Sequence, residues 1–223
     1  MEDARAAIKE VGGLLRGTLG IGVFQSFNSH LLPPILAKFY RQYPGIRVTV
    51  HQLPKRDMED RILHGEMDLG IAYAPTISDK IEAEDLFDDP CALIVGKQHP
   101  LSNKGTLTLH DLIGIPLVLV TPEFPLRQLL DISFAKAAIK PKVVMELNAT
   151  EAILEIVMQS ELATIMSARR PTVKRGIKSI ELEPCIARRA AIFRRKGSHQ
   201  SKAAVALAEL IKHMYGDHSA NAT

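Results

Sequence analysis

The sequence has few cysteines and no long apolar run. Only two cysteines occur among the 223 residues, Cys91 and Cys185, and their spacing suggests neither a redox pair nor a metal pair. Each is therefore predicted to be a small buried or half-buried hydrophobe. The longest apolar stretch, residues 112–120, is interrupted by Gly114 and Pro116 and is far shorter than the ~20 residues needed to cross a bilayer. We therefore expect no membrane partner.

The common catalytic and cofactor motifs are also missing. Gly17, Gly20 and Gly22 form G-x-x-G-x-G, whereas a dinucleotide fingerprint requires G-x-G-x-x-G. The sequence contains no Walker loop, no Gly-x-Ser-x-Gly elbow and, among its eight histidines, no H-E-x-x-H motif. These absences predict a protein that is not an enzyme, with no catalytic residues, no cofactor and no metal.

The charge is almost balanced, with a formal net charge of +3. Basic residues cluster in residues 169–175 and 188–196, but runs this short are usually solvated faces, and no groove-reading motif accompanies them. The amino terminus contains acidic residues and lacks the apolar core of a secretory signal. These features predict a cytoplasmic globular protein that does not contact nucleic acid through these clusters.

Residues 17–72 have the pattern of one β-α-β-α-β unit. Apolar runs and alternating runs predict strands, and apolar residues at helical spacing predict the helices between them. Such alternation indicates a parallel sheet, and ligands bind parallel sheets at the carboxyl ends of the strands. The segments expected to meet a ligand are residues 24–28, 53–57 and 73–76. The predicted strands are 18–23, 46–50 and 67–72, and the predicted helices are 31–43 and 58–63.

A second α/β unit is predicted after Asp89-Pro90, so that the chain forms two lobes. A further strand over residues 190–195 would return the chain to the first lobe, followed by a closing helix over 201–214. Residues 2–15 are predicted to be helical and residues 216–223 to be disordered. In the second unit we expect strands at 91–97, 116–120, 143–146 and 163–166, and helices at 126–138 and 149–159.

Two helix starts are candidate anion sites. Ser26 follows a strand and precedes the 31–43 helix, so it is predicted to cap that helix. Either it only caps, or the free N–H groups of that first turn and the helix dipole also hold an anion. Asn148 and Thr150 stand before a helix of the second lobe and could present a matching site.

Cationic and aromatic residues accompany these helix starts. Lys55 and Arg56 follow the second strand, where they are either solvated or placed to pair with a carboxylate or a small inorganic anion. Phe124 belongs either to the core or to the wall of a pocket. Arg127 lies in a first helical turn, where the dipole disfavours a cation, so we expect an anion or an acidic side chain beside it.

The order of several short motifs resembles the effector-binding domain of LysR-type transcriptional regulators. They are Gly17-Thr-Leu-Gly-Ile-Gly, Leu32-Pro, Phe39-Tyr-Arg-Gln-Tyr-Pro-Gly-Ile, Gly65-Glu-Met-Asp-Leu-Gly-Ile-Ala, Asp85-Leu-Phe, His99-Pro-Leu, Leu107-Thr-Leu-His-Asp-Leu and Ser201-Lys-Ala-Ala. No single motif is diagnostic, and the specificity lies in their order. Three further segments, 68–75, 123–127 and 160–164, look most like the regulator of a cyanate-degradation operon. The sequence departs from the family's usual pattern at Ser160-Glu-Leu-Ala, where Gly-x-Gly-Ile is usual, and at Met166-Ser167, where Leu-Pro is usual.

The resemblance implies an α/β fold of two Rossmann-like lobes joined by two crossing strands, as in periplasmic binding proteins of the second type. Lobe I would comprise residues 17–90 and 191–215 and lobe II residues 91–190, with residues 1–16 ending a linker helix. A small anionic metabolite would bind between the lobes. The effector-binding residues that it implies, together with Phe124 as a wall, are Gln25, Ser26, Lys55, Tyr73, Thr121, Phe124, Arg127, Asn148 and Thr150.

The resemblance also implies partners. The chain would form a homodimer or tetramer, with Leu36, Phe39 and Tyr40 or their neighbours between subunits. DNA would be bound only through a helix-turn-helix domain that this sequence lacks, through either truncation or expression as a fragment, and RNA polymerase is a candidate partner of the full-length protein. The alternative is a solute-binding protein of a transporter, which would need an export signal.

Overall fold

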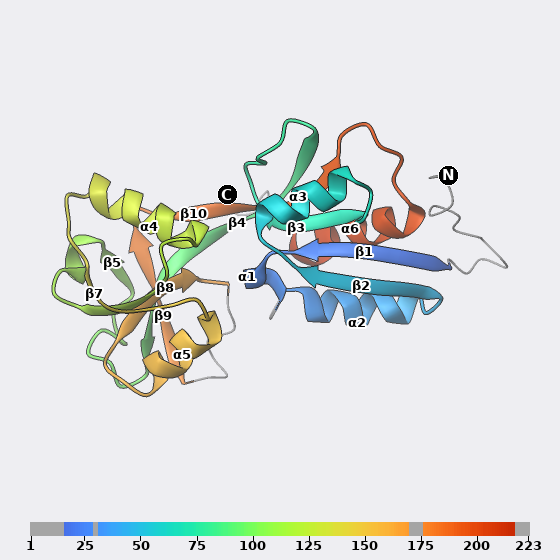
Figure 1. Cartoon of the computed structure of the whole chain (residues 1–223). Helices are drawn as coiled ribbons and strands as arrows, with labels where there is room; N and C mark the ends of the chain where they lie inside the picture. Colours follow the sequence, from blue (N-terminus) through green and yellow to red (C-terminus); the bar gives the residue numbers. More distant parts are fainter. Residues whose placement is uncertain (1–15, 29–30, 170–175, 217–223) are drawn as a thin grey trace, which may run out of the picture. The chain divides into compact units, whose positions relative to one another are not determined.

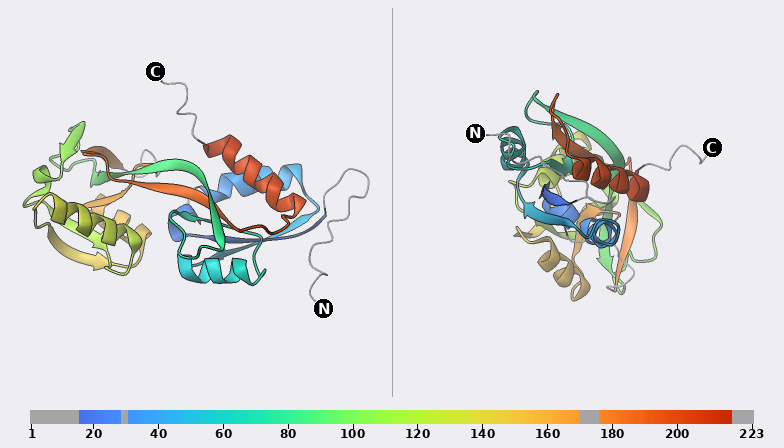
Figure 2. Two further views of the ribbon diagram at one scale, coloured as in Figure 1. Left: turned by 90° about the horizontal axis from the view of Figure 1, so that it is seen from above. Right: turned by 90° about the vertical axis from the view of Figure 1, so that its right-hand side faces the viewer.

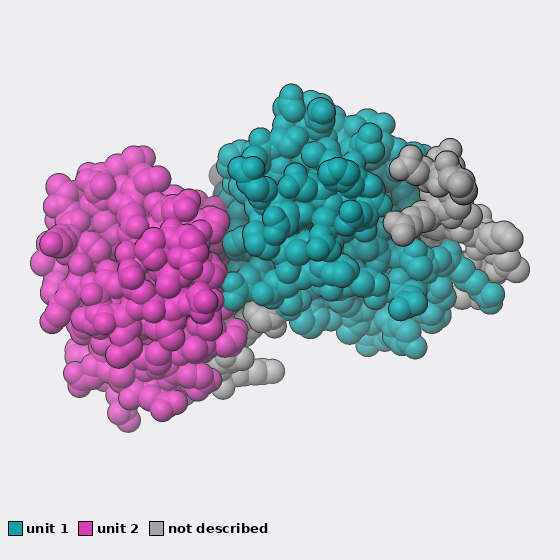
Figure 3. Space-filling view, in the orientation of Figure 1, with its two compact units in different colours: residues 1–88, 189–223 teal, residues 89–188 magenta. Residues whose placement is uncertain are grey.

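The computed structural model describes residues 16–28, 31–169 and 176–216, so the predicted helix over 2–15 and all but Gly216 of the predicted tail lie outside the described residues. The chain divides into two compact units, residues 1–88 with 189–223 (unit 1) and residues 89–188 (unit 2) (Figure 3). It passes between them within β4 (Ile81–Gly96) and within β10 (Ala187–Arg195). The sequence-based boundaries lie two residues later in each case.

Unit 1 contains the β-α-β-α-β arrangement expected from the sequence (Figure 1). Its sheet has the order β2-β1-β3-β10-β4; β1 is parallel to β2 and β3, and β10 is antiparallel to β3. The parallel strands place their carboxyl ends at one edge, as predicted. The elements are β1 (Gly17–Val23), α1 (Gln25–Asn28), α2 (Leu32–Gln42), β2 (Ile46–Gln52), α3 (Lys55–Leu63), β3 (Leu69–Tyr73) and α6 (Lys202–Tyr215).

Helices cover both faces of the unit 1 sheet (Figure 2). Leu69, Ile71 and Tyr73 of β3 join a buried cluster that includes apolar residues of α2 and α6. Ala72 instead joins Met58 and Ile62 of α3 in a separate cluster. Because successive strand residues point to opposite faces, these two clusters mark the two sides of the sheet.

Two glycines allow α3 to approach the sheet closely. A Cβ atom at Gly70 would stand 2.5 Å from the sulfur of Met58, and one at Gly22 would stand 2.7 Å from Met58 Cγ. Met58 is fully buried, so it could not move aside into solvent. Gly22, part of the Gly-rich motif noted above, therefore serves helix-to-strand packing.

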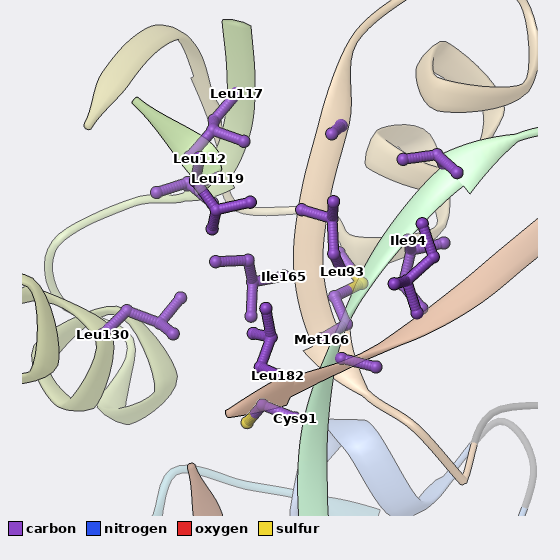
Figure 4. Packing of buried hydrophobic residues seen from close by; sticks show 14 of the residues in the cluster. Cys91, Leu93, Ile94, Leu112, Leu117, Leu119, Leu130, Ile165, Met166 and Leu182 are labelled. Atoms are coloured by element: carbon purple, nitrogen blue, oxygen red, sulfur yellow. The ribbon is translucent and has the colours of Figure 1, made fainter. Parts of the chain in front are cut away.

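Unit 2 is a mixed sheet with β4 in the order β4-β8-β6-β7, and β9 pairs with both β4 and β5. Its core includes Leu93, Leu117, Leu119, Leu130 and Ile165 (Figure 4). No helix among the described residues is long and apolar enough to span a membrane. The elements are β5 (Thr106–Thr108), η1 (His110–Leu112), β6 (Pro116–Val120), α4 (Pro125–Lys136), β7 (Lys142–Leu147), α5 (Thr150–Met158), β8 (Ala163–Ser167) and β9 (Ile177–Glu183).

Three strand segments were not predicted from the sequence. They are β5, β9 and the first ten residues of β4, residues 81–90, which run through the Asp89-Pro90 pair that suggested a break. Most exposed positions of β9 and of this part of β4 carry charged side chains, so neither contains the apolar run that is typical of a fully buried strand. In β9, Ile180 and Leu182 nevertheless alternate with Glu181 and Glu183, and this apolar-polar alternation is the sequence signal that could have identified the strand.

A buried ion pair lies where the chain enters and leaves unit 2. Arg188 Nη2 of β10 donates to Asp89 Oδ2 of β4 at 3.0 Å, and the hydroxyl of Ser167 in β8 donates to Asp89 Oδ1. The side chains of Arg188 and Asp89 are 8% and 2% exposed. The pair therefore ties three strands together at the ends of the unit.

Removal of Arg188 should strongly destabilise the protein. In Arg188→Leu the Asp89 carboxylate stays buried without its cation, which costs about 3–5 kcal/mol in free energy of unfolding. The neighbouring Arg189 is the matched control, because its 2.9 Å pair with Asp88 is largely exposed, so Arg189→Leu should cost less than about 1 kcal/mol. Urea unfolding would measure both values, and equal losses in the two variants would contradict the structural role of the buried pair.

Candidate functional site

Three of the predicted effector-binding residues come together in unit 1. Ser26 Oγ donates to the hydroxyl of Tyr73 at 3.1 Å. Lys55 Nζ donates to the backbone carbonyls of Pro75, at 2.8 Å, and Tyr73, at 3.4 Å. Ser26 follows β1 and Tyr73 ends β3, so the group lies at the carboxyl edge of the sheet, where the sequence placed it.

The predicted capping role of Ser26 is wrong. Ser26 lies inside the four-residue helix α1, and α2 begins after Leu31 with no side-chain cap. Pro33 and Pro34 in the first turn of α2 have no N–H group, so that turn has two donors fewer to satisfy. The Ser26 hydroxyl is engaged by Tyr73 instead, while Gln25 is the half-buried first residue of α1.

The helix α3 starts earlier than predicted, so that Lys55 and Arg56 belong to its first turn. Partial burial lowers the pKa of the Lys55 ammonium, and the negative charge of Glu59 opposes this shift. Arg56 is exposed. Lys55 is therefore a half-desolvated cation held at the strand ends by two carbonyl groups, and a bound anion there would gain from the low local dielectric.

Glu59 is a structural residue of this edge that the sequence did not reveal. It is 2% exposed, and its carboxylate accepts hydrogen bonds from the backbone N–H of Ile77, at 2.8 and 3.1 Å, and of Ser78, at 2.7 Å. This carboxylate holds the loop after β3, which contains the Pro75 carbonyl bound by Lys55. A glutamate one helical turn after a lysine usually indicates a surface pair, so its burial had no sequence signal.

In unit 2 the loops after β6 and β7 are joined at the carboxyl edge. The N–H of Thr121 donates to the carbonyl of Leu147 at 3.2 Å, which brings Thr121 beside the segment of Asn148. The Thr121 hydroxyl donates to Glu123 Oε1 at 2.6 Å. Phe124 precedes α4 and is partly buried against the unit 2 core. Of the two predicted roles, core residue or pocket wall, at least part of the ring has the first.

Arg127 has acidic partners within its own unit. Its Nε donates to Asp131 at 2.8 Å, and its Nη1 donates to Glu146 at 2.5 Å and to the Val120 carbonyl at 3.1 Å. The sequence predicted either a bound anion or an acidic side chain beside Arg127, and the structure shows acidic side chains. Arg127 thus links α4 to β6 and β7, and its contact with an effector stays a prediction.

Asn148 is exposed, and Thr150 is the first residue of α5, one position later than the predicted start. The residue before it, Ala149, provides no side-chain cap. The predicted site residues thus form two groups, one at the strand ends of each unit. Their joint contribution to one effector site remains a prediction. Among the described residues, no group of three or more His, Cys, Asp or Glu side chains is placed to hold a metal ion.

Comparison with known proteins identifies the sequence family and the fold of this chain. The profile of the LysR substrate binding domain matches residues 12–215. The HTH-type transcriptional regulator AlsR of Bacillus subtilis is 28% identical over 144 residues, which cover 64% of this chain and 48% of AlsR. A probable RuBisCO transcriptional regulator of Phaeodactylum tricornutum is 28% identical over 212 residues, 91% of this chain and 69% of the relative. The chain thus spans about half to two thirds of these relatives.

Solved structures share the fold at low sequence identity. The effector binding domain of QuiR in complex with shikimate has a TM-score of 0.75 and 20% identity, covering 90% of this chain and 97% of that domain. The regulatory domain of Synechocystis CcmR in complex with 2-PG has a TM-score of 0.79 and 18% identity, covering 91% and 99%. The effector binding domain of BenM with its effector benzoate has a TM-score of 0.75 and 20% identity, covering 89% and 91%. The predicted two-lobe α/β fold is confirmed.

Loss of the Glu59 charge should loosen the loop after β3. In Glu59→Gln the side chain keeps one oxygen acceptor, while its amide group cannot accept from the second backbone N–H, which costs about 1–3 kcal/mol. Hydrogen exchange at the amides of Ile77 and Ser78 should accelerate. Asp60→Asn, on the exposed side of α3, is the control and should leave both amides protected. Unchanged exchange in Glu59→Gln would contradict the proposed anchoring.

Proposed function

The chain belongs to the LysR substrate binding domain family, and from this premise we propose that it senses a small anionic effector for a LysR-type transcriptional regulator. The observation that carries this proposal is the group formed by Ser26, Lys55 and Tyr73 at the strand ends of unit 1. It supplies a hydroxyl pair and a half-buried ammonium where ligands of parallel sheets bind. DNA binding, contact with RNA polymerase and a cytoplasmic location belong to the whole regulator and are part of the proposal.

The anionic nature of the effector is supported by charge and by helix geometry. The Lys55 ammonium is partly desolvated, and an ion pair with a bound anion would replace the hydration that the ammonium has lost. The helices α2, α4 and α5 all begin without a side-chain cap, whereas α6 is capped by Ser201, whose Oγ accepts from the N–H of Ala204 at 3.1 Å. Uncapped first turns present their remaining N–H groups to anions, and α5, which has no proline in its first turn, keeps all of its donors. QuiR and BenM, which share the fold, were solved with shikimate and benzoate, both carboxylates.

Within this proposal the effector acts by preferring one conformation of the regulator. A ligand can shift a conformational equilibrium only by the difference in its affinity for the two states. The chain passes between the two units within β4 and β10, so these strands provide a covalent path from unit 1 to unit 2. The alternative, a solute-binding protein, is disfavoured because AlsR and the other relative reported above are transcriptional regulators.

A narrower proposal concerns the identity of the effector. Asp68-Leu-Gly-Ile-Ala-Tyr-Ala-Pro75, residues 123–127 and residues 160–164 resemble the regulator of a cyanate-degradation operon. Cyanate is a small anion, and a single half-buried ammonium beside two hydroxyl groups suits a ligand of that size and charge. The relatives found by comparison include regulators of other systems. Cyanate should therefore be tested together with other small anions.

Effector binding should depend on the hydroxyl pair. We expect benzoate, shikimate or cyanate to bind without being chemically changed, and Ser26→Ala, Tyr73→Phe and Thr150→Val each to remove one hydrogen bond to a charged group. Such a bond is worth roughly 1.5–3 kcal/mol, or about ten- to hundredfold in Kd. Isothermal titration calorimetry would measure the loss.

Tyr43→Phe is the control for the tyrosine variant, because Tyr43 packs against Phe39 in the same unit and lies outside the predicted site. It should bind the anion as tightly as the unaltered protein. If Ser26→Ala and Tyr73→Phe bind as well as Tyr43→Phe, the site is misplaced. Formation of any product from the bound anion would contradict a purely sensory role.

We also propose that the chain self-associates through exposed apolar residues. Tyr40 of α2, Ile132 of α4 and Val144 and Met145 of β7 are large hydrophobic side chains exposed to solvent. A register shift in the pairing of β7 with β6 leaves Val144 without a partner residue, and it lets two successive apolar side chains face solvent. Phe39, which was expected at the interface, is 1% exposed within the unit 1 core, so that expectation is wrong.

A charge on the edge strand should weaken this assembly. Val144 is 45% exposed and Val205 of α6 is 43% exposed, so the two residues offer matched substitutions. Val144→Glu should shift a self-complementary dimer toward monomer, because each interface would bury two new carboxylates. Val205→Glu should leave the distribution unchanged. Sedimentation velocity at micromolar concentration measures both, and an identical distribution in the two variants would contradict an interface at β7.

A further inference from the structure

Unit 2 contains a pocket that lies apart from the predicted effector residues. Its volume is about 610 Å³, within the roughly 300–1,000 Å³ typical of small-molecule sites. Three segments form it: residues 108–110 between β5 and η1, the face of α4 from Leu129 to Ala137, and residues 183–187 between β9 and β10. Phe124 and Arg127 lie at the other end of α4, and none of the predicted effector-binding residues lines the pocket.

The lining combines apolar surface with the polar side chains of Thr108, His110, Ser133, Lys136 and Glu183. Leu109, Leu129 and Ile186 provide aliphatic surface, and Lys136 provides an ammonium group. No carboxylate among the described residues forms an ion pair with Lys136. Glu183 also lines the pocket, and its side chain is exposed, as is that of Lys136. A ligand with an apolar body and a single anionic group would thus match the aliphatic surface and the cation together.

We propose that this pocket is a second ligand site, which binds an amphipathic anion such as an aryl carboxylate or aryl sulfonate. The ring system contacts Leu109, Leu129 and Ile186, and the anionic group pairs with Lys136. The inference is independent of the effector proposed above, because the two sites share no residue.

The pocket lies beside the two strands within which the chain passes between the units. Ala187 both lines the pocket and begins β10, and the next residue, Arg188, belongs to the buried pair with Asp89. The N–H of Cys91 in β4 donates to the carbonyl of Ile186 at 2.7 Å. An occupant of the pocket therefore holds the segment that connects to both crossing strands, and it would bias any movement of those strands.

Cys185 provides a reporter inside the pocket. The chain has two cysteines; Cys185 lines the pocket and is exposed, whereas Cys91 is 2% exposed. Burial raises the pKa of the Cys91 thiol to about 11, so that little reactive thiolate forms at neutral pH. Iodoacetamide should thus alkylate Cys185 selectively in the folded protein.

The test measures the rate of Cys185 alkylation with and without 1-anilinonaphthalene-8-sulfonate, an aryl sulfonate. Saturating probe should slow alkylation at least tenfold, and the probe concentration that gives half protection reports its Kd. Lys136→Gln should raise that Kd about three- to fivefold, as expected for loss of a solvent-exposed ion pair. Lys140→Gln removes the same charge from an exposed lysine outside the lining and should leave the Kd unchanged.

Two further arms distinguish the parts of the proposal. N-phenyl-1-naphthylamine, which lacks the sulfonate, should protect Cys185 more weakly, and equal protection would overturn the assignment of an anionic ligand. Ser133→Trp should place an indole ring in part of the pocket and strongly reduce protection while the far-ultraviolet circular dichroism stays unchanged. Absence of protection by the sulfonate in the unaltered protein, or equal effects of Lys136→Gln and Lys140→Gln, would overturn the site. Probe bound at the effector residues would leave Cys185 accessible, and Ser133→Trp would not change its binding. Protection of Cys185 that depends on Ser133 therefore reports binding in the pocket.

Discussion

The buried pair between Asp89 and Arg188 is the interaction on which the organisation of this chain depends. A carboxylate and a guanidinium removed from water are costly, and the cost is recovered only through close geometry and further hydrogen bonds. Here Ser167 supplies one such bond to Asp89, so three strands converge on a single carboxylate. Because Asp89 and Arg188 are the first and last residues of unit 2, the pair closes that unit where the chain enters and leaves it.

A second constraint, the close approach of α3 to its sheet, determines the geometry of the candidate effector site. Gly22 and Gly70 leave room for Met58, and the helix so positioned begins at Lys55. Its first turn therefore reaches the carbonyl groups at the end of β3, and Glu59 in the next turn anchors the following loop. The positions of Lys55 and Glu59 thus depend on the close packing of α3 against Gly22 and Gly70 of the sheet.

The helix α4 carries a predicted effector residue at its start and part of the proposed pocket at its end. Its start carries Arg127, which is bound to Glu146 of β7, and its second half lines the pocket beside Cys185. Rigid secondary structure with a site at each end is a physical route for coupling, although coupling itself is defined by reciprocal changes in affinity. The same helix also carries the exposed Ile132, so the proposed interface and the proposed ligand site share one element.

The sequence by itself determined the β-α-β-α-β unit, the two-lobe fold and the edge where polar residues gather, because hydrophobic periodicity and strand-helix alternation are local properties. It also placed Ser26, Lys55 and Tyr73 at that edge. Only the tertiary structure decided their partners: Ser26 binds a tyrosine 47 positions away, Arg127 binds Glu146 across 19 positions, and Glu59 is buried under a loop. The pocket beside Cys185 could not be predicted from the sequence either, because its walls come from three separate segments. A hydrogen bond or cavity between distant segments depends on how whole elements pack, and no local pattern encodes that packing.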